Sequence, residues 1–409
     1  MKSLGQFPIS QIVVSSLKWL VICSTIGLLS GSASALFLTS LDWVTNWREG
    51  HFWIMAFLPV AGLLIGLLYH HLGKEVEGGN NLLLSEVQSP QKTIPLKMAP
   101  LVLISTLITH LFGGSAGREG TAVQMGGSLA DQLSKPLKLS IEDRRIILIC
   151  GISAGFASVF GTPFAAIVFS LELISIGKLS VRAVVPSVLS AFTADLICDS
   201  WGIYHTSYRL GLAPALSAIN VIYCCGAAIF FGLAARYYIA LVDVISRFAK
   251  RLIAYAPLRP ALGGIIVAGA VFALDTTKYI GLGIPTIISA FKTQLPPYDF
   301  LLKMVFTAVT LGFGFKGGEV TPLFFIGATL GSALSIIIPL PFSLLAAIGF
   351  VAVFSGAAKT PIASTLMAME LFGIEYGMFA TIACGVAYYF SGPTGIYEAY
   401  DQTSMNKTK

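Results

Sequence analysis

Charged side chains are scarce in this sequence. Asp, Glu, Lys and Arg make up only 11% of its 409 residues, whereas hydrophobic residues make up 55%. Soluble domains carry about 25% charged residues, so this composition excludes an ordinary soluble protein and indicates an integral membrane protein. The sequence also lacks a dense array of Lys and Arg interleaved with aromatic residues, and its net charge of +6 is modest, which argues against nucleic acid as a partner.

Metal-binding and catalytic motifs are absent from the sequence as well. The six cysteines lie in apolar runs without C-x-x-C spacing, as expected of small buried residues. His70 and His71 end an apolar segment, where an interfacial position is favoured over metal binding. The sequence therefore predicts no metal, no cofactor and no enzyme, and only turnover of a lipid or peptide would revive the enzyme alternative.

The apolar segments are of two lengths. Long ones are predicted to cross the membrane; they cover 9–38, 52–72 and 215–244. The first is interpreted as a helix rather than a signal peptide, because it stays apolar beyond the small residues at 32–35. Short ones cover 99–112, 145–160, 163–176 and 284–291. Interrupted helices are tolerated in a membrane where they line a cavity or are buried in protein, so these segments predict the interior of a transporter or channel.

The chain repeats itself after about 200 residues. The residues Gly-Arg-Glu-Gly-Thr at 117–121 return as Gly-Gly-Glu-Val-Thr at 317–321, and Thr-Pro-Phe-Ala at 162–165 returns as Thr-Pro-Ile-Ala at 360–363. Each second motif is followed by a glutamate nine residues after its proline, Glu172 and Glu370. Two motifs in the same order predict a duplication, and such repeats in transporters often run in opposite directions with the binding site where half-helices meet.

If the halves are inverted, the helices predicted to start near Asn81, Thr121 and Thr321 converge. Each start carries about half a positive charge and several unpaired N–H donors. Such a site favours a small anion and disfavours a cation channel or exchanger, although glutamates in the membrane are compatible with both.

At these residues the sequence resembles the CLC family of anion channels and proton-coupled anion antiporters. Gly117 to Gly120, followed by Val123 and Gln124, matches the family's G-R-E-G-P-x-V-Q motif except for Thr121. Residues 318–322 lie where the family has G-x-F-x-P, and 79–82 lie where it has G-S-G-I-P. The resemblance implies an all-α integral membrane fold of two inverted repeats, 1–207 and 208–409, with many short re-entrant helices and no cytoplasmic regulatory domain. It also implies a homodimer in the bilayer of a cell membrane, here that of a bacterium.

Two departures from the family pattern favour fluoride over chloride. Chloride-handling members commonly have serine at the position of Asn80 and phenylalanine at that of Val320. This chain replaces both, and in this it resembles the fluoride-transporting branch of the family. Fluoride holds its water strongly, and the Asn80 amide can offer two N–H donors in exchange. By resemblance the anion-binding residues are Asn80, Asn81, Gly117, Arg118, Gly120, Val320, Thr321 and Tyr397. Capping of the next helix is the alternative for the two asparagines, and an interfacial position is the alternative for Tyr397.

Glu119 is predicted to be the moving gate, because its carboxylate can take the anion's place when charged and leave when protonated. Pairing with Arg118 is the alternative. Glu319 either couples protons or pairs with Lys316. The exchangers of the family often carry a glutamate where this chain has Leu173, which leaves two options: an uncoupled channel, or an antiporter with another proton route. We expect a fluoride/proton antiporter, with chloride transport as the second candidate.

Overall fold

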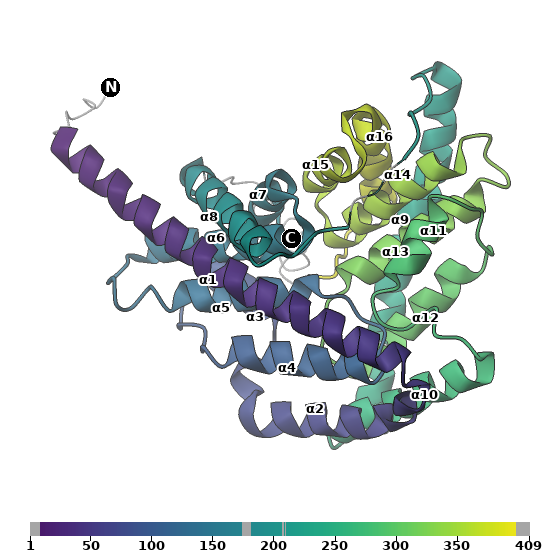
Figure 1. The fold of residues 1–409 in the computed structure, drawn as a ribbon, viewed down its shortest axis with the longest axis horizontal. Helices are drawn as coiled ribbons and strands as arrows, with labels where there is room; N and C mark the ends of the chain where they lie inside the picture. Colours follow the sequence, from purple (N-terminus) through teal and green to yellow (C-terminus); the bar gives the residue numbers. More distant parts are fainter. Residues whose placement is uncertain (1–8, 174–180, 207, 209, 398–409) are drawn as a thin grey trace, which may run out of the picture.

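The computed structural model describes residues 9–173, 181–206, 208 and 210–397, and within these ranges the chain forms sixteen α-helices and no β-strand (Figure 1). This confirms the predicted all-α fold. The first eight are α1 (Ile9–Glu49), α2 (Leu58–Leu72), α3 (Asn80–Gln88), α4 (Met98–Leu111), α5 (Glu119–Asp131), α6 (Ile141–Phe160), α7 (Pro163–Glu172) and α8 (Val181–Ser200). The second eight are α9 (Ala218–Leu252), α10 (Leu258–Leu274), α11 (Ile284–Ala290), α12 (Asp299–Gly312), α13 (Val320–Leu334), α14 (Phe342–Ala358), α15 (Pro361–Phe372) and α16 (Gly377–Phe390).

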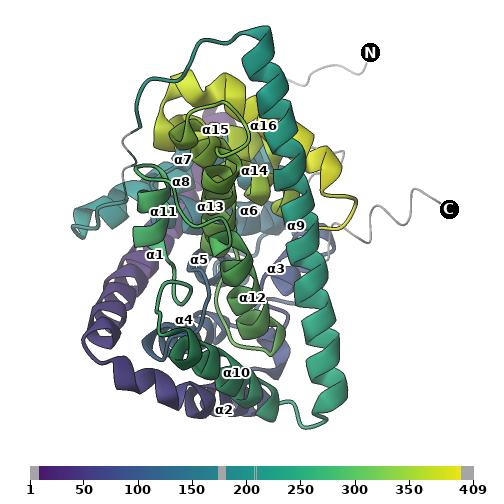
Figure 2. The ribbon, with the colours of Figure 1, turned by 90° about the vertical axis from the view of Figure 1, so that its right-hand side faces the viewer.

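The two sets of eight helices correspond to each other in order. Each opens with a long helix, α1 or α9, and in each the sixth helix packs against the fifth and the eighth. Counterparts also touch across the molecule, because α2 contacts α10, α5 contacts α13 and α7 contacts α15. Figure 2 shows α2 and α10 together at one end, α15 and α16 at the other, and α9 running along one side. The boundary predicted between residues 207 and 208 falls in the segment that joins α8 to α9 and stays a prediction.

Four helices in the described ranges are long and apolar enough to cross a membrane, Val14–Glu49, Phe52–Leu72, Val181–Ser200 and Ala218–Leu252. The first predicted span was too short, since α1 continues to Glu49. The predicted helix 215–244 begins and ends later, as α9. Ser217 caps its start by accepting the N–H of Asn220 at 3.3 Å, as serine before a helix commonly does.

The predicted short helices are present with slightly different bounds. Segment 99–112 becomes α4, 145–160 lies in α6, and 284–291 becomes α11. Segment 163–176 becomes α7, which ends at Glu172; residues 174–176 lie outside the described residues. Helices α4, α7 and α11 are too short to cross a bilayer alone. Helix α6 is longer than predicted, since it begins at Ile141 and has 20 residues.

The repeated glutamates of α7 and α15 cap each other's helices. Glu172, the last residue of α7, accepts the backbone N–H groups of Ile362 and Ala363 at 3.1 and 2.9 Å. In the same way, Glu370 accepts the backbone N–H groups of Phe164 and Ala165 at 3.0 and 2.8 Å. Each carboxylate therefore satisfies donors that the first turn of the other helix leaves unpaired. This crossing fits an anchoring role for both residues.

Candidate functional site

The glycine-rich loops before α5 and α13 meet at the centre of the molecule. Gly117 donates its N–H to the carbonyl of Gly318 at 2.6 Å, and Gly318 donates to the carbonyl of Gly117 at 2.8 Å. The two residues form an isolated antiparallel bridge. Because α5 begins at Glu119 and α13 at Val320, this bridge brings two helix N-termini together, as the inverted repeat predicts. Both helices start one or two residues earlier than expected.

The carboxylate of Glu119 lies at this junction, fully buried. One oxygen, Oε2, accepts the backbone N–H of Arg118 at 3.1 Å and that of Thr321 at 3.2 Å. The other, Oε1, accepts the hydroxyl of Thr321. The side chain thus folds back from the start of α5 onto the first turn of α13, where a negative charge is favoured by the helix dipole. The donors around it are the kind that would hold a free anion.

The side chain of Arg118 is a minor partner of this carboxylate. Its Nε lies 3.9 Å from Oε1 of Glu119 and makes no hydrogen bond within the described part of the chain. An ion pair at that distance is weak compared with the hydrogen bonds that Glu119 accepts from Thr321. The alternative in which Glu119 only pairs with Arg118 does not describe the geometry.

A cavity of about 380 Å³ opens beside the bridge, and we call it the Asn80 cavity. Six of the predicted site residues line it: Asn80, Asn81, Gly120, Glu319, Val320 and Tyr397. The Asn80 amide nitrogen lies close to Gly120, 3.0 Å from the point where a Cβ on that residue would sit. Gly79 holds the N-cap position of α3 with φ +54°. Neither Asn80 nor Asn81 therefore occupies the capping position that was the alternative role for them.

A second, smaller cavity lies among residues that Glu119 contacts. It has a volume of about 20 Å³, and both Arg118 and Thr321 line it, so we call it the Arg118 cavity. Thr206 and Tyr208 also line it, although they come from the segment between α8 and α9. A space of this size can hold about one water-sized particle. Sequence reasoning missed Thr206 and Tyr208, because no motif marks a connecting segment as part of a site.

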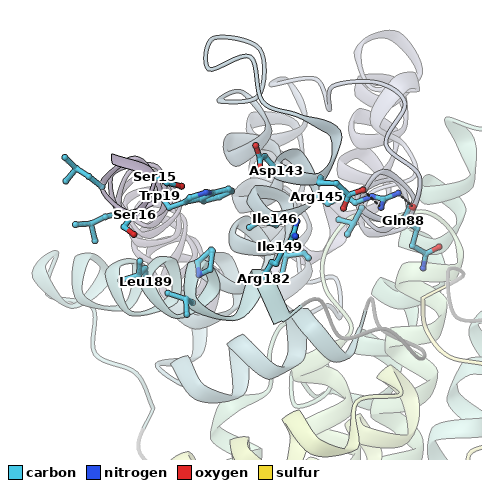
Figure 3. A pocket seen from close by; sticks show the side chains of 16 residues that line it. Ser15, Ser16, Trp19, Gln88, Asp143, Arg145, Ile146, Ile149, Arg182 and Leu189 are labelled. Atoms are coloured by element: carbon cyan, nitrogen blue, oxygen red, sulfur yellow. Dashed lines mark hydrogen bonds and ion pairs between the residues drawn. The ribbon is translucent and has the colours of Figure 1, made fainter. Parts of the chain in front are cut away.

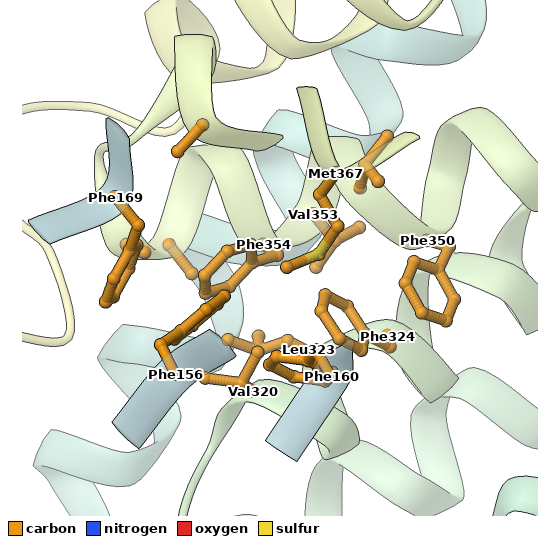
Figure 4. Close-up of a cluster of buried hydrophobic side chains, with 14 of the residues drawn as sticks. Phe156, Phe160, Phe169, Val320, Leu323, Phe324, Phe350, Val353, Phe354 and Met367 are labelled. Carbon is orange, nitrogen blue, oxygen red and sulfur yellow. The ribbon is translucent and has the colours of Figure 1, made fainter. Parts of the chain in front are cut away.

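Aromatic side chains surround the start of α13. Figure 4 shows Val320 among phenylalanines from α6, α7, α13 and α14. Only 2% of the surface of Val320 is exposed, so its side chain mainly packs. The ring of Tyr397 stands edge-on to Phe169, with ring centres 6.5 Å apart. Tyr397 is 8% exposed and lines the Asn80 cavity, so it is a cavity residue rather than an exposed interfacial one.

Glu319 faces the Asn80 cavity without the lysine that sequence reasoning offered as its partner. The ammonium of Lys316 instead lies 4.1 Å from the centre of the Tyr69 ring, in a cation–π contact. Both Lys316 and Tyr69 line the same cavity as Glu319. A carboxylate therefore remains in the cavity together with the Asn80 amide.

Two buried cations fix the loops near the bridge. Arg48, 6% exposed at the end of α1, donates to the carbonyl of His110 at 2.7 Å. Lys303, fully buried in α12, donates to the carbonyls of Tyr279 and Gly281 at 3.2 and 2.7 Å. Gly281 in turn donates its N–H to Gly114 at 2.9 Å. Neither cation stood out in the sequence, because neither belongs to one of the repeated motifs.

A larger cavity than either the Asn80 cavity or the Arg118 cavity lies away from this site. It has a volume of about 1100 Å³ between α1, α6 and α8, where Trp19, Ile146 and Leu189 form part of its wall (Figure 3). None of the predicted site residues lines it. The converging donors and carboxylates, rather than cavity volume, therefore mark the candidate site.

Comparison with known proteins shows the family of the chain. Residues 61–392 match the family model described as voltage gated chloride channel. A "Chloride/fluoride channel protein" of Pseudomonas syringae pv. tomato is 54% identical over 388 residues, which cover 93% of this chain and 86% of that one. An "H(+)/Cl(-) exchange transporter ClcA" of Vibrio cholerae is 27% identical over 386 residues, covering 85% and 80%.

Solved structures share the fold. The crystal structure of a CLC-type fluoride/proton antiporter superimposes with a TM-score of 0.91 at 35% identity, covering 94% of this chain and 98% of that one. A slow cyanobacterial Cl⁻/H⁺ antiporter superimposes with a TM-score of 0.84 at 18% identity, covering 96% and 99%. The latter likeness concerns the fold alone.

Proposed function

The chain belongs to the voltage gated chloride channel family, and from this premise we propose that it is a secondary active transporter that exports fluoride in exchange for protons. Proteins similar to it are named for chloride or fluoride transport and for fluoride/proton antiport. The proposal includes no enzymatic activity. It places the chain in a bacterial cell membrane as a homodimer in the bilayer, with residues 1–207 and 208–409 as its two repeats.

The Glu119 carboxylate is the observation that carries this proposal. It occupies a cradle made of two backbone N–H groups and the Thr321 hydroxyl. A free anion needs the same donors, so the two negative charges compete for one place. Protonation removes the charge of Glu119 and weakens its hold there. An anion can then enter the site. When the anion has left on one side of the membrane and Glu119 has released its proton on the other, the ionised carboxylate returns, which links the two ions.

Asn80 supports fluoride as the anion. Its amide lines the cavity beside Gly120, and its Oδ1 is buried without a hydrogen-bond partner among the described residues. Oδ1 is an acceptor, so the atom of this amide that can donate to an anion is Nδ2, which lies 3.0 Å from the point where a Cβ on Gly120 would sit. Two N–H donors can replace part of the hydration of a small anion that enters the Asn80 cavity. Gly117, Gly120 and Asn81 shape the surroundings of these donors.

Glu319 supplies the second carboxylate of the proposed proton route. It shares the Asn80 cavity with Tyr397, whereas Leu173 replaces the glutamate expected in chloride exchangers. Glu172 is engaged with the first turn of α15 and is an anchor in this scheme. Protons therefore pass between Glu319 and Glu119 through the region of the bridge, and no residue at position 173 takes part.

The test is simultaneous measurement of both ions in liposomes. Purified protein is reconstituted into vesicles loaded with equal fluoride and chloride, and both anions and internal pH are followed after a gradient is imposed. We expect fluoride to leave with opposite proton movement, and Glu119→Gln to abolish the coupled movement. Glu142→Gln, at an exposed site on α6, is the matched control and should behave as wild type.

Each other outcome identifies a competing function. Chloride leaving as fast as fluoride would make this a chloride/proton antiporter of the same family and would contradict the role given to Asn80. Fluoride leaving without protons would make it an uncoupled channel. Coupled exchange that survives in Glu119→Gln would refute the gate.

A further inference from the structure

A lysine occupies an unusual backbone position at the end of α14. Lys359 ends that helix with φ +63° and ψ +38°, and its counterpart in the first repeat, Gly161 at the end of α6, has φ +66° and ψ +34°. The next residues, Thr162 and Thr360, also share their backbone angles. The duplication therefore kept one left-handed turn in both copies but placed glycine in one and lysine in the other.

A lysine at this position destabilises the folded protein for two reasons. A side chain in the left-handed region is strained, whereas glycine adopts that region without strain. The ammonium is also withdrawn from water, since Lys359 is only 4% exposed. Local strain that persists in a folded chain often marks a functional constraint. The contacts of the lysine show which constraint that is.

The ammonium of Lys359 holds the segment that follows α16. It donates to the Ser391 hydroxyl at 2.6 Å and to the carbonyl of Gly392, and it lies 5.4 Å from the centre of the Tyr388 ring. Ser391 is the residue at which α16 ends. The lysine thus fixes the direction in which the chain leaves this helix.

The same turn holds the segment again a few residues later. Ile396 donates its N–H to the carbonyl of Ala357 at 2.9 Å, and Gly395 lies against the lysine stem, 3.1 Å from its Cγ to the Cβ position of the glycine. The chain from Ser391 to Ile396 is therefore attached to the end of α14 at both of its ends. The next residue is Tyr397, which lines the Asn80 cavity.

We propose that Lys359 is a positioning residue for Tyr397: by fixing the segment 391–396, it sets where the tyrosine lies in the anion cavity. This inference rests on the proposed function, because it assumes that Tyr397 contributes to anion transport. The lysine itself acts through the segment and does not line the cavity.

A double-mutant cycle tests the proposal in reconstituted protein. Lys359→Met, Tyr397→Phe and the double variant are compared for the half-saturating fluoride concentration, the maximal rate and the fluoride-to-chloride ratio. Each single variant should raise the half-saturating concentration by roughly tenfold, since each removes hydrogen-bonding capacity that serves the cavity. The double variant should be no worse than either single one, because both act through one tyrosine. Lys359→Arg should restore most of the loss, and the exposed Lys292→Met is the control.

The outcomes separate this inference from the proposed function. If Tyr397→Phe changes nothing, the anion role of Tyr397 fails and the inference falls with it, while coupled fluoride transport can still be observed in the wild type. If Tyr397→Phe weakens fluoride use but Lys359→Met does not, positioning alone is refuted. Additive losses would show that Lys359 acts by another route, which also overturns the inference. A lower maximal rate with unchanged anion preference would indicate general destabilisation and count against it.

Discussion

The absence of a side chain at Gly117 allows the Glu119 carboxylate to fold back over the loop. A Cβ built on Gly117 would lie 2.6 Å from Oε2 of Glu119 and 3.0 Å from the carbonyl oxygen of Gly318. Both distances are shorter than ordinary contacts, and the carbonyl is held by the bridge. The carboxylate would be the part that moves. The position of the proposed gate thus depends on a neighbour that has no side chain.

Gly117→Ala should therefore uncouple the two ions. We expect the carboxylate to leave its cradle, so that fluoride passes with fewer protons per anion than in wild type, while the protein still folds. The measurement is the ratio of fluoride to proton flux in liposomes. Gly385→Ala, in α16 where a Cβ meets open space, is the control and should keep the wild-type ratio. An unchanged ratio in Gly117→Ala would contradict the placement of Glu119.

Single residues were predictable where a motif announces them. Gly117 and Glu119 stand in a charged, glycine-rich stretch between apolar segments, and charge in such a place is costly enough to attract notice. No motif marks Lys359 or Tyr208. The hydrogen-bond partner of Lys359, Ser391, lies 32 residues further along the chain. Tyr208 lies in a connecting segment and reaches the Arg118 cavity only in the folded chain. Their contributions become visible only when the chain is folded.

At the scale of helices, α7 and α15 depend on each other for their first turns. Glu172 and Glu370 each accept two backbone N–H groups from the opposite helix, across 190 to 206 residues of sequence. The sequence showed that both glutamates are repeated at the same distance from a proline. It could not show the crossing, since nothing local tells a glutamate which helix start it will meet.

Replacing either glutamate by glutamine should lower stability more than transport. An amide has only one acceptor oxygen, so each of Glu172→Gln and Glu370→Gln should cost about 1–2 kcal/mol, in the range of lost helix caps. The measurement is thermal unfolding of the protein in detergent, with flux ratios in liposomes alongside it. Glu142→Gln is the control for stability. A changed fluoride-to-proton ratio with normal stability would instead indicate that these residues carry protons.

At the scale of the whole molecule, the two repeats form one body around their shared centre. Counterpart helices touch each other, and the bridge and the crossed glutamates join the halves at several places. The pattern of long and short apolar segments predicted this architecture, because the duplication is visible in the motifs. It did not predict the helix ends, which depend on capping residues such as Ser217 and on contacts from the other half.

The halves should assemble without a covalent link. We expect residues 1–207 and 208–409, expressed together as two polypeptides, to form a complex that catalyses fluoride/proton exchange, and neither alone to do so. Co-purification through a tag on one half and flux measurements on the product provide the test. A pair broken instead inside the second half, after Leu274 at the end of α10, is the control and should be less active. Failure of the first pair with success of the second would refute the proposed boundary.

The crossed glutamates, Glu172 and Glu370, can be compared with the proposed gate, Glu119. Among the residues that the structure describes, three carboxylates lie on the first turns of helices to which they do not belong: Glu172 on α15, Glu370 on α7 and Glu119 on α13. The first two come from the ends of helices and close their sites permanently. Glu119 comes from the start of its own helix, beside a glycine loop, and in the proposed function its side chain leaves the site when it is protonated. The duplicated fold thus supplies its helix starts with internal counter-ions, and transport requires that just one of these counter-ions be exchangeable.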